Sequence, residues 1–202
     1  MLWRIIRHGG CKVMDKVIFL DRDGVINQDS PDYIKSCDEF KFLPGSLTAI
    51  KNLTENGFHI IVITNQSVIN RKMVTPNGLE KIFAKMKSGV VAANGKITDI
   101  FFCPHKPDDN CQCRKPKPGL IKMAEKKYNI NLSQAIMVGD SAKDIECAIN
   151  AKCYKSILVK TGNADKAIKD LTIKKISPDF IAKDLEKAAE WIIQLYNPCA
   201  KV

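Results

Sequence analysis

Residues 16–26, Lys-Val-Ile-Phe-Leu-Asp-Arg-Asp-Gly-Val-Ile, form the stretch that decides the fold. The apolar residues 17–20 are too few and too uniformly apolar for a half-exposed strand, so they predict a strand buried in a parallel sheet. Asp21 and Asp23 then stand at the carboxyl end of that strand, where open α/β sheets bind ligands. An exposed turn is the alternative, because Asp-x-Asp-Gly is ordinary turn chemistry. A solvated turn, however, needs no fully apolar strand before it.

The same two carboxylates predict a metal ion. Residues two apart in an extended chain point to the same side, so Asp21 and Asp23 would repel each other without a cation between them. Oxygen ligands of this kind suit Mg²⁺.

Length and composition favour one globular domain. The chain has 202 residues, of which 45% are hydrophobic and 27% charged, as in ordinary soluble proteins. Met14 directly precedes the first predicted strand, so we expect residues 1–13 to be an extension and residues 14–202 a single domain. No apolar run is long enough to span a membrane, and the start of the chain lacks a signal-peptide core. We therefore expect a cytoplasmic monomer with no membrane partner.

The net charge of +10 raises the question of a nucleic-acid partner. Only five of the 32 basic residues are arginine, although planar bidentate recognition of phosphate favours arginine. Lysine is the usual residue of solvated faces, and a basic protein also attracts small phosphorylated anions. We expect a small phosphorylated substrate and no nucleic acid.

Strands alternate with helices along the chain. The predicted strands cover 17–20, 59–63, 97–102, 135–138, 156–159 and a short edge strand at 180–181; the predicted helices cover 47–57, 76–94, 119–128, 143–150 and 185–196. The lysine-rich segment between 162 and 180 has only weak periodicity, and residues 27–42 favour a small hairpin or flap. This order predicts an α/β fold with a doubly wound parallel sheet.

Cysteine and histidine gather in the irregular stretch 103–118. It contains three thiols and an imidazole, the ligand set of a closed tetrahedral Zn²⁺ site: Cys103, His105, Cys111 and Cys113. The spacing is not the common Cys-x-x-Cys pattern, and four unrelated loop residues are the alternative. Little else would order this proline-rich loop, however, whereas a structural zinc contributes on the order of 10 kcal/mol. We expect a structural zinc that positions the adjoining Arg114 and Lys115.

Polar groups follow several of the predicted strands, and their order resembles the haloacid dehalogenase (HAD) superfamily of phosphotransferases. Asp21-Arg22-Asp23-Gly24 matches its first motif and Thr64-Asn65-Gln66 its second. Lys115 matches the third, and Gly139-Asp140-Ser141 with Asp144 the fourth. Each motif alone is a weak indicator of the family. All four together, in the expected order over residues 17–162, are a specific one.

The resemblance implies a Rossmann-like fold and a set of catalytic roles. Asp21 would be the nucleophile that forms an aspartyl-phosphate, and Asp23 the general acid and base. Thr64 and Lys115 would hold the transferring phosphoryl group. Mg²⁺ would be bound by Asp21, Asp140 and the backbone carbonyl of Asp23. Asp144 would either orient a neighbouring group or serve as a first-turn acid of a helix.

The zinc loop narrows the resemblance to a small cap-less branch, which contains heptose 1,7-bisphosphate 7-phosphatases and histidinol-phosphate phosphatases. Arg114 would grip a second phosphate, because a bidentate guanidinium suits it. The other substrate contacts implied are Asp29, Tyr33, Asn65, Gln66, Ser67, Arg71 and Ser141. Val68 and Asn70 depart from the glycine and alanine of the branch, which bears on substrate fit more than on chemistry.

The implied activity is removal of the C7 phosphate of a heptose bisphosphate, on the way to lipopolysaccharide core sugar. The first alternative is hydrolysis of histidinol phosphate. A nucleic-acid 3′-phosphatase is a further alternative, which the lack of an aromatic stacking platform disfavours. A zinc-bearing binding module without turnover is disfavoured by the intact catalytic set.

Overall fold

The computed structural model describes residues 13–197. All of the expected extension 1–13 except Val13 lies outside this range. The strands are β1 Val17–Leu20, β2 His59–Asn65, β3 Ile97–Cys103, β4 Ile136–Gly139, β5 Lys155–Val159 and β6 Phe180–Ala182; the α-helices are α1 Ser46–Glu55, α2 Pro76–Ala92, α3 Gly119–Tyr128, α4 Ala142–Ala151, α5 Ala164–Ile173 and α6 Leu185–Tyr196, with short 3₁₀ helices η1 Pro107–Asp109 and η2 Leu132–Gln134. No helix within residues 13–197 is long and apolar enough to cross a membrane.

The six strands form one parallel sheet in the order β3-β2-β1-β4-β5-β6. β1 lies between β2 and β4, and all four of its residues are fully buried. Strand order reverses beside β1, which is where doubly wound sheets bind ligands. The predicted fold class is confirmed.

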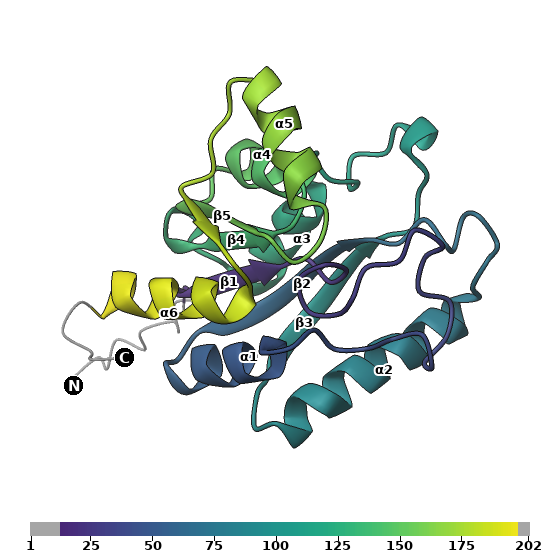
Figure 1. Cartoon of the computed structure of the whole chain (residues 1–202), viewed down its shortest axis with the longest axis horizontal. Helices are drawn as coiled ribbons and strands as arrows, with labels where there is room; N and C mark the ends of the chain where they lie inside the picture. The colour runs from purple at the N-terminus through teal and green to yellow at the C-terminus, as the bar shows by residue number, and fades with distance from the viewer. Residues whose placement is uncertain (1–12, 198–202) are drawn as a thin grey trace, which may run out of the picture.

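Alternation along the strands divides the apolar core between the two faces of the sheet. Ile18 and Leu20 face a cluster that includes residues of α1, α2 and α6, whereas Val17 and Phe19 face a cluster with residues of α3 and α4. α5 packs beside α4 over β5. The result is a three-layer arrangement, with α1, α2 and α6 on one face and α3, α4 and α5 on the other (Figure 1).

The predicted strands and helices are present, with boundaries shifted by one or two residues. Thr75 caps α2 as expected, since its hydroxyl accepts a hydrogen bond from the backbone N–H of Gly78 at 3.1 Å. Helix α5, Ala164–Ile173, was missed in the lysine-rich segment because its buried face consists of two alanines and one leucine, which give a weak apolar signal. Residues 27–42 form a flap closed by a bridge between Asn27 and Phe42.

Candidate active site

The carboxyl ends of the central strands bring Asp21, Lys115 and Asp144 into contact. The ammonium Nζ of Lys115 lies 2.8 Å from Asp21 Oδ1 and 2.6 Å from Asp144 Oδ1. It also donates to the carbonyl of Ile63 in β2 at 2.9 Å. Lys115 is almost fully buried, so its charge is balanced by ion pairs with two carboxylates, and one of its hydrogens is donated to a backbone carbonyl.

The position of Lys115 is fixed through its backbone as well. The side-chain amide of Asn65 accepts from Lys115 N–H at 3.1 Å and donates to the Lys115 carbonyl at 3.3 Å. Burial alone would lower the pKa of Lys115, but the carboxylates of Asp144 and Asp21 outweigh burial and raise the pKa above its ordinary value. Lys115 is therefore a permanently charged group at this edge of the sheet.

Asp144 both orients a neighbouring group and serves as a first-turn acid of α4, the two alternatives that the sequence left open. It lies in the first turn of α4, and its Oδ2 accepts hydrogen bonds from the backbone N–H and hydroxyl of Ser141, at 3.1 and 2.6 Å. Its other oxygen binds Lys115. Asp144 therefore begins the helix and orients the lysine at the same time.

Asp140, at the end of β4, is closely approached by the backbone at Gly24 and at Gly162. A Cβ atom on Gly24, where φ is +77°, would lie 2.3 Å from Asp140 Oδ2, and one on Gly162 would lie 1.9 Å from it. Only glycine allows both segments to approach so closely. The backbone N–H of Asn163 donates to Asp140 Oδ2 at 3.0 Å. Burial, together with the charges of Asp144 and Asp21, raises the pKa of Asp140 to about 8.

These carboxylates fit a divalent cation. Asp21, Asp140 and Asp144 each bring an oxygen within 4.8 Å of the others. Lys115 supplies one positive charge to three carboxylates, which leaves an excess of two negative charges. Burial raises the pKa of Asp21 to about 6, despite the lowering effect of Lys115. Hard oxygen ligands with this charge are typical of a Mg²⁺ site.

The carboxylate of Asp23 accepts hydrogen bonds from three side chains. The Arg22 side chain reaches its carboxylate through Nε at 3.0 Å and Nη2 at 2.7 Å. Asn27 Nδ2 and Gln66 Nε2 complete the set at 2.9 and 3.0 Å. Gln66 also donates to Thr64 Oγ1 at 2.9 Å, so the buried Thr64 hydroxyl keeps its own hydrogen for another acceptor. Asp23 and Thr64 are thus linked beside Asp21.

Cys103, His105, Cys111 and Cys113 come together as predicted. The three sulfur–sulfur distances are 3.5, 3.2 and 3.5 Å, and His105 Nδ1 lies 3.6 and 3.4 Å from the sulfurs of Cys103 and Cys113. Four Zn²⁺ ligands of this type would be about 3.8 Å apart at a Zn–S length of about 2.3 Å. Burial raises the pKa of the Cys103 thiol to about 12. The cluster fits a structural zinc with no open position.

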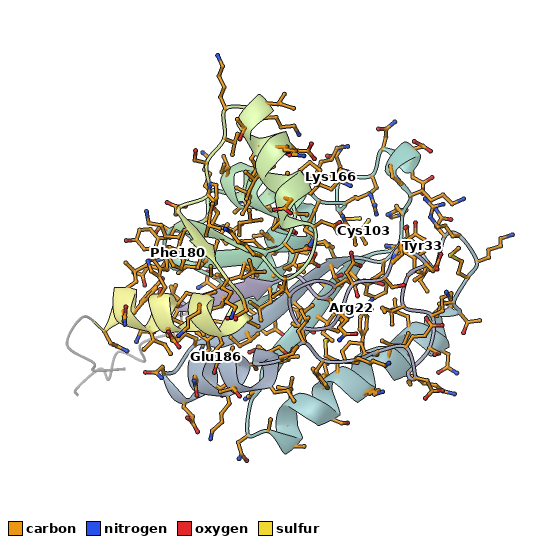
Figure 2. All side chains as sticks on the ribbon, in the orientation of Figure 1. Arg22, Tyr33, Cys103, Lys166, Phe180 and Glu186 are labelled. Carbon is orange, nitrogen blue, oxygen red and sulfur yellow. The ribbon has the colours of Figure 1, made fainter. Side chains whose placement is uncertain are left out.

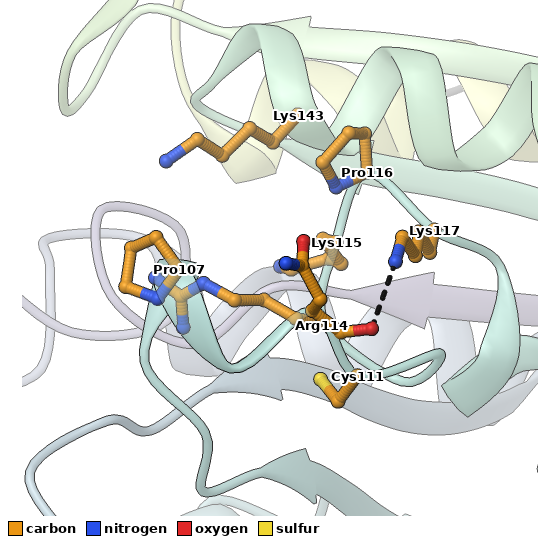
Figure 3. Close-up of a pocket in the computed structure, with 8 residues that line it drawn as sticks. Pro107, Cys111, Arg114, Lys115, Pro116, Lys117 and Lys143 are labelled. Atoms are coloured by element: carbon orange, nitrogen blue, oxygen red, sulfur yellow. Dashed lines mark hydrogen bonds between the residues drawn. The ribbon is translucent and has the colours of Figure 1, made fainter.

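A pocket of about 200 Å³ adjoins the Cys/His cluster, and its lining includes four cationic residues, Arg114, Lys115, Lys117 and Lys143 (Figure 3). Nη1 of Arg114 donates to the carbonyl of His105 at 2.9 Å, which fixes the guanidinium on the loop. Lys117 also lines the pocket, but its ammonium group donates to the carbonyl of Asn110 at 3.1 Å. Lys115 forms part of the lining, so the pocket opens beside the carboxylate cluster.

The remaining predicted substrate residues differ in exposure and in their partners. The Arg71 guanidinium is centred 5.6 Å from the ring centroid of Tyr33 in the flap, and Tyr33 lies on the same side of the molecule as Cys103 (Figure 2). Asp29 accepts from Asn163 Nδ2 at 2.9 Å. Ser67 is buried. The side chains of Asn65, Gln66 and Ser141 donate hydrogen bonds to Lys115, Asp23 and Asp144, respectively.

Sequence reasoning missed Lys143 and Asn163. Lys143 is a first-turn residue of α4, immediately before Asp144. Asn163 follows Thr161-Gly162 at the carboxyl end of β5, the same edge of the sheet as Asp21. Polar groups that follow parallel strands converge at one edge of the sheet, as they do after β1, β2 and β4. The same argument predicts that Asn163, after β5, belongs to the site.

Comparison with known proteins relates this chain to one group of phosphatases. A HAD-hydrolase-like family model matches residues 112–188. The D-glycero-beta-D-manno-heptose-1,7-bisphosphate 7-phosphatase of Neisseria meningitidis serogroup A is 47% identical over 153 residues, 76% of this chain and 81% of that protein. The enzyme of the same name from Bordetella bronchiseptica is 40% identical over 179 residues, 89% of this chain and 98% of the relative.

A crystal structure of D,D-heptose 1,7-bisphosphate phosphatase from B. bronchiseptica, complexed with magnesium and phosphate, is similar throughout. It superposes with a TM-score of 0.84 at 39% identity, covering 89% of this chain and 99% of the other. The predicted resemblance is confirmed.

Proposed function

This chain belongs to the family of D-glycero-beta-D-manno-heptose-1,7-bisphosphate 7-phosphatases among the HAD-like hydrolases, and we propose that it removes the C7 phosphate of a heptose 1,7-bisphosphate. The observation that carries the proposal is the juxtaposition of Asp21, Lys115 and Asp140 at one edge of the sheet. Asp23 lies two residues beyond the proposed nucleophile. The reaction is a Mg²⁺-dependent phosphomonoester hydrolysis, which we assign to synthesis of lipopolysaccharide core sugar.

In the proposed mechanism Asp21 attacks phosphorus through Oδ2. Its Oδ1 already accepts from Lys115 Nζ and from the backbone N–H of Arg22 at 2.7 Å. The attack forms an aspartyl-phosphate as the ester oxygen departs. Asp23 gives a proton to that oxygen and then takes one from the water that hydrolyses the intermediate. Thr64 donates its hydroxyl hydrogen to the phosphoryl group.

Asp21, Asp140 and the backbone carbonyl of Asp23 would hold the magnesium ion. Bound there, it supplies the positive charge that lets an anionic nucleophile approach an anionic phosphate. Lys115 supplies further charge from the other side of Asp21. Cys103, His105, Cys111 and Cys113 would hold a structural zinc that shapes the loop carrying Arg114 and Lys115.

The phosphate that is not transferred would bind at the cationic pocket. Arg114 presents a fixed guanidinium there, and Lys143 adds a second positive charge across the opening. Arg71 and Tyr33 would contact the sugar from the flap side, with Asp29, Asn65, Gln66, Ser67 and Ser141 shaping the remainder of the site. We also propose that residues 14–202 act as one domain in a cytoplasmic monomer, which light scattering can test.

The test is phosphate release from a panel of esters, with Mg²⁺ and with EDTA. The panel contains both anomers of the heptose bisphosphate, fructose 1,6-bisphosphate, histidinol phosphate and a 3′-phosphorylated oligonucleotide. We expect Mg²⁺-dependent preference for a heptose bisphosphate, and a loss of at least about 10³-fold in kcat for Asp21→Asn. Asp99→Asn, on the β3 edge, is the control. Preference for histidinol phosphate would refute the proposed substrate. Full activity of Asp21→Asn would refute the proposed mechanism.

A further inference from the structure

Asn70 joins two loops that follow neighbouring strands of the sheet. Its side-chain amide donates to the carboxylate of Asp109. Asn70 belongs to the connection 66–75 after β2, whereas Asp109 ends η1 in the Cys/His loop after β3. Both connections project beyond the carboxyl edge of the sheet (Figure 1). The contact therefore links the outer parts of two segments whose inner ends meet at a hydrogen bond from Gln66 N–H to the Cys103 carbonyl, 2.7 Å long.

The Asp109 side of this contact depends on the Cys/His cluster. The same carboxylate oxygen accepts the backbone N–H of Lys106 at 2.8 Å, and Lys106 adjoins His105. The carbonyl of His105 in turn accepts from Arg114. Asp109 thus takes its position from the residues that would bind zinc.

On the other side of the contact, Asn70 is followed directly by Arg71 in the same turn. Residues 66–74 are folded back on themselves by hydrogen bonds from Arg71 N–H to the Ser67 carbonyl and from Met73 N–H to the Val68 carbonyl, both 2.9 Å long. Asn70 and Arg71 therefore belong to one hydrogen-bonded turn. Arg71, the next residue after Asn70, lies over the ring of Tyr33 in the flap.

We propose that Asn70 is a positioning residue for substrate binding, which fixes Arg71 at the mouth of the site by tying the turn to the Cys/His loop. This inference rests on the proposed function, because it assigns Arg71 to the polar part of a sugar phosphate remote from the transferred group. Asn70 itself touches no reacting atom. It acts on affinity for large substrates and leaves the chemical step unchanged.

The first test separates KM from kcat. For Asn70→Ala we expect KM for the heptose bisphosphate to rise about tenfold, the size of one lost hydrogen bond, with kcat unchanged. Turnover of p-nitrophenyl phosphate, which cannot reach Arg71, should stay the same. Asn70→Asp should raise KM further because two carboxylates would then face each other. Adding Asp109→Asn should remove this charge repulsion but leave KM above the parent value, because the atom of residue 109 that faces residue 70 must also accept the Lys106 N–H. Asn56→Ala, which loses a bond to the Asn52 carbonyl, is the matched control.

The second test does not depend on turnover. Amide hydrogen exchange of residues 67–73 should quicken in the parent protein when zinc is removed by a chelator. In Asn70→Ala exchange there should already be fast with zinc bound, and zinc removal should add little. Equal responses in both proteins, or an unchanged KM in the zinc-loaded variant, would overturn the inference. If no ester in the panel is hydrolysed, the proposed function fails, while the exchange result still decides the link between the loops.

Discussion

Asn65 and Lys115 form a reciprocal pair, in which one side-chain amide satisfies both the N–H and the carbonyl of the lysine backbone. The two residues are 50 positions apart in the chain. This pair fixes the backbone from which Lys115 reaches Asp21 and Asp144, so the amide controls the geometry of the charged cluster without belonging to it.

Asn65→Ala tests this control. We expect kcat to fall roughly tenfold to a hundredfold and the free energy of unfolding to fall by about 1–3 kcal/mol, because two partly buried backbone groups lose their partner. Steady-state kinetics and urea denaturation measure the two effects. Asn56→Ala again serves as the control. A variant with the parent kcat would show that Lys115 is held by its ammonium contacts alone.

The Mg²⁺-free protein should lose stability as pH rises. The ordinary aspartate pKa is 3.8, whereas the folded state raises the pKa of Asp21 to about 6 and that of Asp140 to about 8. Between pH 3.8 and about 8 the folded protein therefore binds more protons at these two groups than the unfolded chain does. Their contribution to the free energy of unfolding falls through this window and levels off above it.

Denaturation of the zinc-loaded protein without Mg²⁺, at about pH 5 and about pH 8, measures this dependence. Mg²⁺ should restore stability mainly at the higher pH, because it binds the ionised carboxylates. Asp140→Asn should make the Mg²⁺-free profile shallower. Greater stability at the higher pH without Mg²⁺, unaffected by Asp140→Asn, would contradict the prediction.

Gly162→Ala should weaken Mg²⁺ activation. The added Cβ would lie 1.9 Å from Asp140 Oδ2, so the carboxylate must move from the site. We expect the Mg²⁺ concentration for half-maximal activity to rise by about tenfold or more, equivalent to about 1.4 kcal/mol of binding free energy. Gly57→Ala is the control: its φ is +79° but its Cβ would meet nothing within 4 Å. That variant should lose stability and keep its Mg²⁺ response.

Cys103→Ser should remove the structural zinc. Cys103 is the one fully buried member of the four-residue cluster. We expect about one zinc per chain in the parent and very little in the variant, with a lower Tm and lower activity because Arg114 and Lys115 lose their support. Metal analysis and calorimetry measure this. Cys153→Ser, outside the cluster, should keep its zinc, and an unchanged metal content in Cys103→Ser would refute the assignment.

The sequence was most informative where strands are uniformly apolar. Residues 17–20 and 60–63 are apolar throughout and buried, so these strands and the residues that follow them could be predicted. The Asn65–Lys115 pair could not, because Lys115 lies 50 positions further along the chain in an irregular loop whose path no periodicity describes. The pairing of Arg22 with Asp23 was also missed, since neighbouring opposite charges in a sequence do not reveal which way their side chains turn. Asn70–Asp109 likewise joins loops whose paths no periodicity describes.

The residues proposed for the chemical step and those proposed for substrate choice lie in different parts of the fold, so substitutions in the two sets have different consequences. The proposed chemical groups stand directly after β1, β2 and β4 or are tied to those strands, as Lys115 is to the Ile63 carbonyl. The residues proposed to choose the substrate lie mostly in the flap, in the connections after β2 and β3, and around the start of α4. Substitutions there can redirect the enzyme to another phosphate ester at little cost to the core, whereas the strand ends tolerate almost none. A family of enzymes with different substrates can therefore diversify from one chemical core.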